Sequence, residues 1–200
     1  RVEDPAVPVS RVQPPAGLYH QADFRAGARR LAARGLSFEA WQYHVQLGDV
    51  LALARAVPDL TIIVNHLGGP LGIGSFAGRM DEVHEAAKTG LAALAGADNV
   101  VVKLGGVGMT RYGTGWEDRE QPPTSDEVVA TWGGLIRWTI DTFGPDRCLF
   151  ESNYPVDGET TSYVVLWNAF KKLTADFTES ERAALFAGSA RRVYRLTLPS

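Results

Sequence analysis

The sequence predicts an α/β fold built on a parallel sheet. Apolar or β-branched runs at residues 60–64 and 100–102 lack polar alternation, which is typical of strands buried on both faces. Stretches with helical periodicity separate such runs, and the resulting order is a helix, four strand–helix pairs and a final helix. Alternation of this kind favours parallel strands that are joined by right-handed crossovers.

The first half of the chain is expected to hold two helices and two strands. Asp23 is expected to cap a helix that runs through Arg34, where Gly35 can adopt the left-handed conformation of a helix stop. The next elements are a strand, a helix and a second strand, at residues 36–44, 47–57 and 60–64.

The second half continues the alternation. We expect a helix, a strand, a long helix, a short strand and two further helices, over residues 80–95, 99–104, 125–143, 147–151, 162–173 and from 178 onward. Thr124 or Ser125 is expected to cap the long helix, and Thr178 with Glu181 forms a capping box for the last one. The connection over residues 109–124 is long for an α/β unit, so we expect a mobile lid there.

Composition narrows the class of protein. The chain has 200 residues, with 20 Lys and Arg against 23 Asp and Glu, which gives no electrostatic case for binding nucleic acid or an anionic membrane. Cys148 is the single cysteine, so an internal disulfide is excluded and a reduced, cytoplasmic setting is expected. The whole of residues 1–200 is expected to be one domain, in which the proline-containing residues 1–17 are an extended lead-in.

Two histidines end successive expected strands. His44 and His66 are one strand–helix–strand unit apart, and parallel strands place such residues side by side at one edge of the sheet. Neutral imidazole is a common ligand of divalent metals and a common general base, so the pair indicates a shared site. The alternative is two unrelated polar positions, each hydrogen-bonded locally.

The later strands also end in polar residues. Lys103 ends the third strand, either as a site residue or as a lysine that pairs with a carboxylate. The fourth strand ends at Glu151, and Asp157 follows as the nearest further carboxylate on that side of the site. Glu151 could equally be the structural partner of an arginine.

Four segments stand at successive expected strand ends: WQYHVQ (residues 41–46), IVNHLGGP (63–70), NVVVKLGG (99–106) and FESNYPVD (150–157). In this order they resemble the amidohydrolase-related family, and in particular its branch of metal-dependent TIM-barrel hydrolases that includes lactonases. The resemblance implies the C-terminal half, about four strand–helix units, of a (β/α)8 barrel, and a chain that is incomplete at its N-terminus. A half-barrel would leave two sheet edges and its inner face uncovered, so self-association into a homo-oligomer is expected.

The same resemblance implies roles for individual residues. His66 matches the family's catalytic histidine and His44 a metal-binding histidine, while Asp157 is a weaker candidate for the base. Lys103, Asn153 and Trp41 are expected to bind substrate. Many relatives carry an aspartate where this chain has Asn153, and a neutral amide cannot act as a base. The sequence also lacks the His-x-His motif that supplies two metal ligands in the family, so a zinc or manganese site is expected only as one alternative.

The predicted function is hydrolysis of a small molecule, with water added to the carbonyl of a lactone or another cyclic ester or amide. A second hypothesis is decarboxylation of a small aromatic or unsaturated acid, because the wider family includes decarboxylases. A third is a non-catalytic fragment or binding domain that keeps the fold without the full set of ligands. Neither nucleic acid nor membrane is an expected partner.

Overall fold

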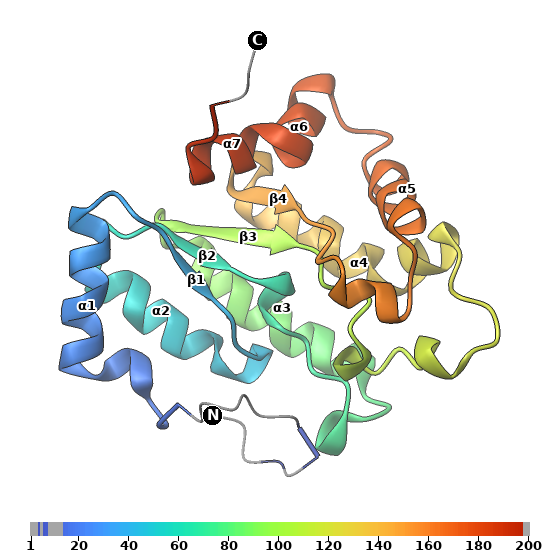
Figure 1. The fold of residues 1–200 in the computed structure, drawn as a ribbon, viewed down its shortest axis with the longest axis horizontal. Coiled ribbons are helices and arrows are strands. Elements are labelled where there is room, and N and C mark those ends of the chain that lie inside the picture. Colours follow the sequence, from blue (N-terminus) through green and yellow to red (C-terminus); the bar gives the residue numbers. More distant parts are fainter. Residues whose placement is uncertain (1–3, 5, 8–13, 198–200) are drawn as a thin grey trace.

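Four parallel strands form the centre of the molecule. The computed structural model describes residues 4, 6, 7 and 14–197, and its sheet has the order β1-β2-β3-β4 (Figure 1). The strands are β1 (Phe38–Ala40), β2 (Ile62–Val64), β3 (Val100–Leu104) and β4 (Cys148–Phe150). Every neighbouring pair is parallel, which confirms the predicted α/β class.

Helices connect and flank these strands. They are α1 (Ala22–Ala33), α2 (Leu47–Ala56), α3 (Met80–Ala95), α4 (Ser125–Phe143), α5 (Tyr163–Leu173), α6 (Glu179–Ala183) and α7 (Ser189–Tyr194). A single π-helical turn, Ala184–Gly188, joins α6 to α7. Within the described part of the chain, none of the helices combines the length and apolar character that a bilayer crossing requires.

The main core lies between the sheet and α2, α3 and α4, which cover one face of it (Figure 1). Alternate strand residues point into this core, including Ile62, Val64 and Val102, each of which is fully buried. Trp132 of α4 is the largest fully buried side chain and packs against Tyr112. The helices therefore cover one face of the sheet, as the outer helices of a (β/α)8 barrel cover the outside of its strands.

The opposite face of the sheet is not left uncovered, contrary to the expectation for a half-barrel. Ile63, Val101 and Leu149 form a second apolar cluster there with Val193 of α7. On the other side of β4, Phe186 of the π-helical turn packs on Phe150, with ring centroids 4.9 Å apart. The helices α6 and α7 lie beside β4 (Figure 1). Apolar side chains of this C-terminal segment therefore reach both faces of the sheet at β4.

The clearest differences from the predicted element boundaries are in the first strand and at the start of α1. The first strand is only Phe38–Ala40, rather than residues 36–44, because its ladder partner β2 itself ends at Val64. The cap of α1 is Gln21, and Asp23 lies in the first helical turn instead. The cap at Thr124 and the capping box of Thr178 with Glu181 are confirmed, and the structure adds Ser162 as the cap of α5.

The long connection after β3 is anchored at several points. Met109, Tyr112 and Trp116 are buried in the main core, so this half of the connection is not free to open as a lid. The longest run of exposed residues in the connection is 117–122, and Gly113 and Thr124 are also exposed. Most of the lead-in expected over residues 1–17 lies outside the described residues.

Candidate active site at the carboxyl ends of the strands

His66 lies where β2 ends, at the start of the short turn His66–Gly68. Its φ of 54° is in the left-handed region, which is uncommon for a residue with a side chain and concentrates at functional sites. The side chain is 9% exposed. The strand thus delivers the imidazole to the carboxyl edge of the sheet, where α/β proteins place their chemistry.

The imidazole of His66 is bonded to Glu151, the residue after β4. The distance between Nδ1 of His66 and Oε1 of Glu151 is 2.5 Å. An ionised carboxylate can only accept a hydrogen bond, so Nδ1 carries the ring proton in this pair. The neutral ring then has its lone pair on Nε2, which is the arrangement of a base oriented by an acid.

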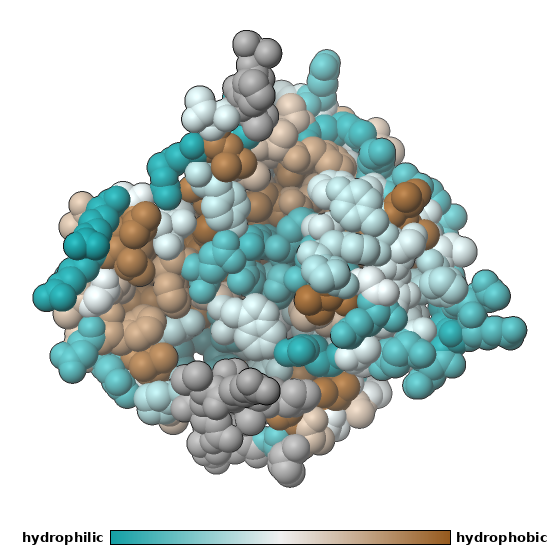
Figure 2. Space-filling view, in the orientation of Figure 1, coloured by the Kyte–Doolittle hydropathy of each residue, from teal (hydrophilic) through white to brown (hydrophobic). Residues whose placement is uncertain are grey.

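Glu151 is held in turn by Lys103, at 3.4 Å between Nζ and Oε2. The same ammonium donates to Glu39 of β1 at 2.9 Å, and Tyr194 of α7 also donates to Glu39 at 2.7 Å. Burial opposes the charge of Lys103, but Glu151, Glu39 and Tyr194 together hold its pKa above the ordinary value. In the space-filling view, hydrophilic side chains gather over the middle of the sheet (Figure 2).

Asp157 is fully buried and close to this group. Its Oδ2 accepts the backbone N–H of Gly108 at 3.0 Å, and its Oδ1 accepts the side-chain amide of Asn153 at 2.7 Å. Burial raises the pKa of Asp157 to about 6, although both hydrogen bonds and His66 act in the opposite direction. The two residues that sequence reasoning placed at this edge, Asn153 and Asp157, are therefore partners of one another.

Three glycines after β3 allow these side chains to approach the backbone. A Cβ on Gly105 would lie 2.3 Å from the carbonyl oxygen of Glu151, and one on Gly106 would lie 2.5 Å from Nδ1 of His66. A Cβ on Gly108 would lie 3.0 Å from the Cβ atom of Asp157. Gly106 also has a φ of 72°, which a side chain disfavours.

His44 does not join this group by any hydrogen bond among the described residues. Its Nδ1 accepts the backbone N–H of Leu71 at 3.2 Å, and its ring lies edge-on to Phe76. Burial lowers the pKa of His44, which favours the neutral ring, and that ring then carries its proton on Nε2. In this tautomer neither nitrogen has a free lone pair for a metal.

The donor set does not otherwise fit a metal. Among the described residues, no three His, Cys, Asp or Glu side chains are placed to hold one together. Asn153 directs its amide nitrogen at Asp157, so its side chain is held by that carboxylate. The role of His44 as a metal ligand therefore remains a prediction without support from this geometry.

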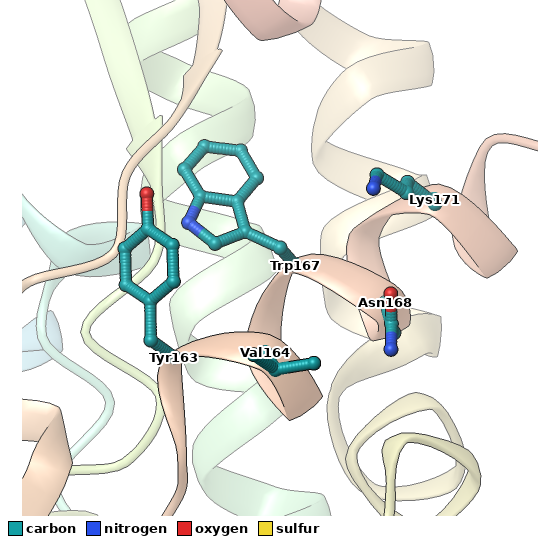
Figure 3. Close-up of a pocket in the computed structure, with 5 residues that line it drawn as sticks. All are labelled: Tyr163, Val164, Trp167, Asn168 and Lys171. Carbon is teal, nitrogen blue, oxygen red and sulfur yellow. The ribbon is translucent and has the colours of Figure 1, made fainter.

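Trp41 follows β1 at the same edge, and it is 43% exposed. The guanidinium of Arg111 lies 5.3 Å from its ring centroid. A small surface hollow of about 260 Å³ lies elsewhere, on α5 (Figure 3). Its lining residues hold no acid–base pair and are Tyr163, Val164, Trp167, Asn168 and Lys171. We therefore place the candidate site at the strand ends and not at this hollow.

Sequence reasoning missed four residues of the arrangement, one of which is Tyr194, the donor to Glu39. Glu39 was hidden inside an expected strand, although a charged residue in an apolar run is a signal that could have found it. Tyr112, whose hydroxyl donates to the carbonyl of His66 at 3.3 Å, and Arg111 both lie in the connection that was expected to be a lid. Glu151 was noted, but its partners are a histidine and a lysine rather than an arginine.

A family model described as Amidohydrolase matches residues 6–196. The chain belongs to the amidohydrolase family. An uncharacterized protein, y4mH, of Sinorhizobium fredii is 39% identical over 175 residues, which are 87% of this chain and 52% of that protein. An L-fucono-1,5-lactonase of Burkholderia multivorans is 30% identical over 185 residues, or 90% of this chain and 58% of that enzyme. The chain thus spans between half and two thirds of the length of these amidohydrolase relatives.

Solved amidohydrolase structures share the fold. A crystal structure of an amidohydrolase from Burkholderia multivorans with bound zinc has a TM-score of 0.78 and 24% identity, covering 92% of this chain and 62% of that one. A 5-carboxyvanillate decarboxylase from Sphingomonas paucimobilis has a TM-score of 0.52 and 17% identity, covering 91% of this chain and 56% of that one. The four-stranded sheet and its helices therefore correspond to part of an amidohydrolase TIM barrel.

Proposed function

We propose that this chain carries the hydrolytic residues of a lactonase, which adds water to the carbonyl carbon of a cyclic ester. The observation that carries the proposal is the 2.5 Å bond between His66 and Glu151 at the carboxyl edge of the sheet. The family membership supports hydrolysis, and the name of the Burkholderia multivorans relative supports a lactone as the substrate class.

In the proposed reaction, Nε2 of His66 accepts a proton from water as the water oxygen bonds to the carbonyl carbon. The carbonyl π electrons move to the carbonyl oxygen, which becomes an oxyanion. When the oxyanion collapses, the bond to the ring oxygen breaks and this oxygen takes the proton from Nε2. The product is an open hydroxy acid, and the imidazole is neutral again.

The surrounding residues support that proton transfer. Glu151 fixes the ring tautomer and stabilises the imidazolium that forms when Nε2 is protonated. Lys103, whose charge is already shared by Glu39 and Glu151, holds Glu151 in place rather than facing a substrate. Asp157 is a less suitable base than His66, because each of its oxygens already accepts a hydrogen bond.

A metal has no assigned part in this reaction. The zinc in the Burkholderia multivorans structure belongs to that protein. The described residues of this chain do not supply a matching set of ligands: no three candidate side chains are placed together, and Nδ1 of His44 already accepts a backbone N–H. The proposal therefore relies on the acid–base pair alone, and His44 and Asn153 are proposed to shape the substrate site.

The test is ring opening of L-fucono-1,5-lactone, followed with a pH indicator. It is run on the 200-residue chain and on any longer natural chain that contains this sequence. Because His66 moves the proton, His66→Gln should lower the rate by roughly 10²–10⁴-fold with an unchanged melting temperature. Glu151→Gln should lower it by less. His20→Gln, an exposed histidine bonded to Asp49, is the matched control.

Three results would contradict the proposal. The first is a wild-type rate in His66→Gln, and the second is a loss that unfolding explains. The third is release of CO₂ from an aromatic acid without lactone opening, which would favour the decarboxylase. The decarboxylase structure from Sphingomonas paucimobilis shows a shared fold alone, so lactone hydrolysis is the function that the residues support better. A small-molecule substrate, a cytoplasmic location and a homo-oligomer remain predictions.

A further inference from the structure

Helix α7 lies on the face of the sheet to which the charged residues of the candidate site point. Glu39 is in register with Ile63, and partners in a ladder direct their side chains to the same face. Val193 of α7 packs on Ile63 there. The next residue, Tyr194, has its ring centroid 5.8 Å from Nζ of Lys103. The apolar contact of α7 therefore brings a tyrosine to the charged group.

Glu39 is the acceptor that joins Tyr194 to this group. Its Oε1 accepts the hydroxyl of Tyr194 at 2.7 Å, and its Oε2 accepts Nζ of Lys103 at 2.9 Å and the side-chain amide of Asn65 at 3.2 Å. Burial and the bond to Glu39 raise the pKa of Tyr194 to about 12, although Lys103 acts in the opposite direction. The hydroxyl therefore keeps its proton at neutral pH and is the donor in this bond.

Lys103 is shared unequally between two carboxylates. Its Nζ lies 2.9 Å from Glu39 and 3.4 Å from Oε2 of Glu151, whose other oxygen accepts Nδ1–H of His66. Both carboxylates attract the same ammonium, so a weaker attraction by one of them leaves more of it for the other. The bond from His66 is stronger when less of the negative charge of its acceptor is neutralised.

We propose that Tyr194 is a positioning residue for the reaction at His66. By donating to Glu39, its hydroxyl weakens the attraction of Glu39 for Lys103, and the ammonium is then available to hold Glu151. The C-terminal helix thereby sets how strongly Glu151 holds the Nδ1 proton of His66. This inference rests on the proposed hydrolysis for the identity of the reaction, but the bond between His66 and Glu151 can be measured without turnover.

The test follows the Nδ1 proton of His66 by NMR of protein labelled with ¹⁵N at histidine. A stronger bond to the carboxylate moves this resonance downfield, and the ring nitrogen shifts report the same bond if the proton exchanges too fast to be observed. His66→Gln identifies the resonance by its loss. The compared proteins are the wild type, Tyr194→Phe, Glu39→Gln and Tyr163→Phe. Tyr163 is 50% exposed on α5, so its variant loses a hydroxyl away from the charged group.

Tyr194→Phe should move the resonance downfield, because Glu39 then draws Lys103 away from Glu151. Glu39→Gln should move it upfield, because Lys103 then pairs with Glu151 alone. Tyr163→Phe should match the wild type. In the lactone assay, both Tyr194→Phe and Glu39→Gln should lower kcat by about tenfold or less with an unchanged KM, because the carboxylate that orients the imidazole is displaced in each.

Three results would overturn the role of Tyr194. They are an unchanged resonance in Tyr194→Phe, shifts in the same direction in Tyr194→Phe and Glu39→Gln, as a general loosening of the site would give, and an equal shift in Tyr163→Phe. Any of them together with lactone opening by the wild type would leave the hydrolytic function standing. Opposite shifts without lactone opening by the wild type would retain the control of the His66–Glu151 bond by Tyr194 and reject the hydrolytic function.

Discussion

At the scale of single residues, the candidate site combines two carboxylates in different surroundings. Glu151 lies between a histidine and a lysine, at 2.5 Å from Nδ1 of His66 and 3.4 Å from Nζ of Lys103. Asp157 is fully buried and lacks a cationic partner within ion-pair distance among the described residues. Burial is therefore the largest influence on the pKa of Asp157.

Asp157 should make the protein less stable as pH rises. Its folded pKa of about 6 lies above the ordinary 3.8, so the folded state holds its proton more tightly than the unfolded chain. The stability that its protonated form contributes is present at low pH and is lost between about pH 4 and 6. Each unit of pKa difference corresponds to about 1.4 kcal/mol, so the total loss in the free energy of unfolding is about 3 kcal/mol at most.

Asp157→Asn should remove this dependence, because the amide does not ionise. The free energy of unfolding of the variant minus that of the wild type should rise from pH 4 to pH 7, as measured by urea denaturation at several pH values. Using the difference cancels the other carboxylates, such as Glu127, whose pKa is lowered to about 2. A difference that stays constant across this range would mean that Asp157 does not titrate there.

The residue types at the strand ends were predictable, but their pairings were not. His66 and Lys103 each follow from the position of a polar residue at the end of an apolar run, and Asp157 was predicted as the nearest further carboxylate after the fourth strand. The bond between His66 and Glu151 joins residues 85 positions apart, and no local pattern encodes that contact. It follows from the register and order of the strands, which only the folded sheet defines.

At the scale of elements, the glycine-rich segment after β3 shapes the site. Gly106→Ala should push the ring of His66 away from Glu151, because the new Cβ would lie 2.5 Å from Nδ1. We expect a loss of roughly 1–3 kcal/mol from overpacking and a lactone-opening rate lowered toward that of His66→Gln. Thermal melting and the lactone assay measure the two effects.

Gly78→Ala is the matched control for that prediction. Gly78 also has a φ of 72°, but a Cβ there would meet nothing within 4 Å. The Gly78→Ala variant should therefore lose about 1 kcal/mol of the free energy of unfolding through backbone strain alone, and it should keep its activity. Equal activity in the two alanine variants would argue against a role for Gly106 in positioning His66.

A second prediction at this scale concerns where a protease cuts the connection after β3. Its buried residues Met109, Tyr112 and Trp116 should protect the first part from protease, and the exposed stretch 117–122 should be cut first. Limited trypsin digestion with mass spectrometry would locate the first cut, which is expected after Arg119. Early cleavage after Arg111 would mean that this half is mobile in solution after all.

At the scale of the whole molecule, the C-terminal helices link both faces of the sheet. Val193 of α7 completes the cluster of Ile63, Val101 and Leu149, and Tyr194 reaches the polar group through Glu39. Val193→Ala should lower the free energy of unfolding by roughly 1–3 kcal/mol, because it leaves a cavity on this face. Urea denaturation measures the change.

Val164→Ala is the control, since Val164 is 65% exposed on α5 and its truncation should be nearly neutral. Equal effects of the two substitutions would show that α7 is not packed on the sheet in solution. Sedimentation at several protein concentrations would show at the same time whether the chain self-associates, as a half-barrel with open edges was expected to do.

The sequence by itself determined the class of fold, the order of the strands and helices, most helix ends and the edge of the sheet that carries the polar residues. These properties are local, because apolar periodicity and caps depend on residues a few positions apart. It also placed the chain in a family through four short motifs.

The tertiary structure alone decided which of those polar residues meet. It paired His66 with Glu151, placed Lys103 between two carboxylates, left Arg111 stacked on Trp41, and brought α7 onto the sheet. The physical reason is that strand register, crossovers and close backbone contacts at glycine set these distances. Each of them joins segments that are dozens of residues apart in the chain.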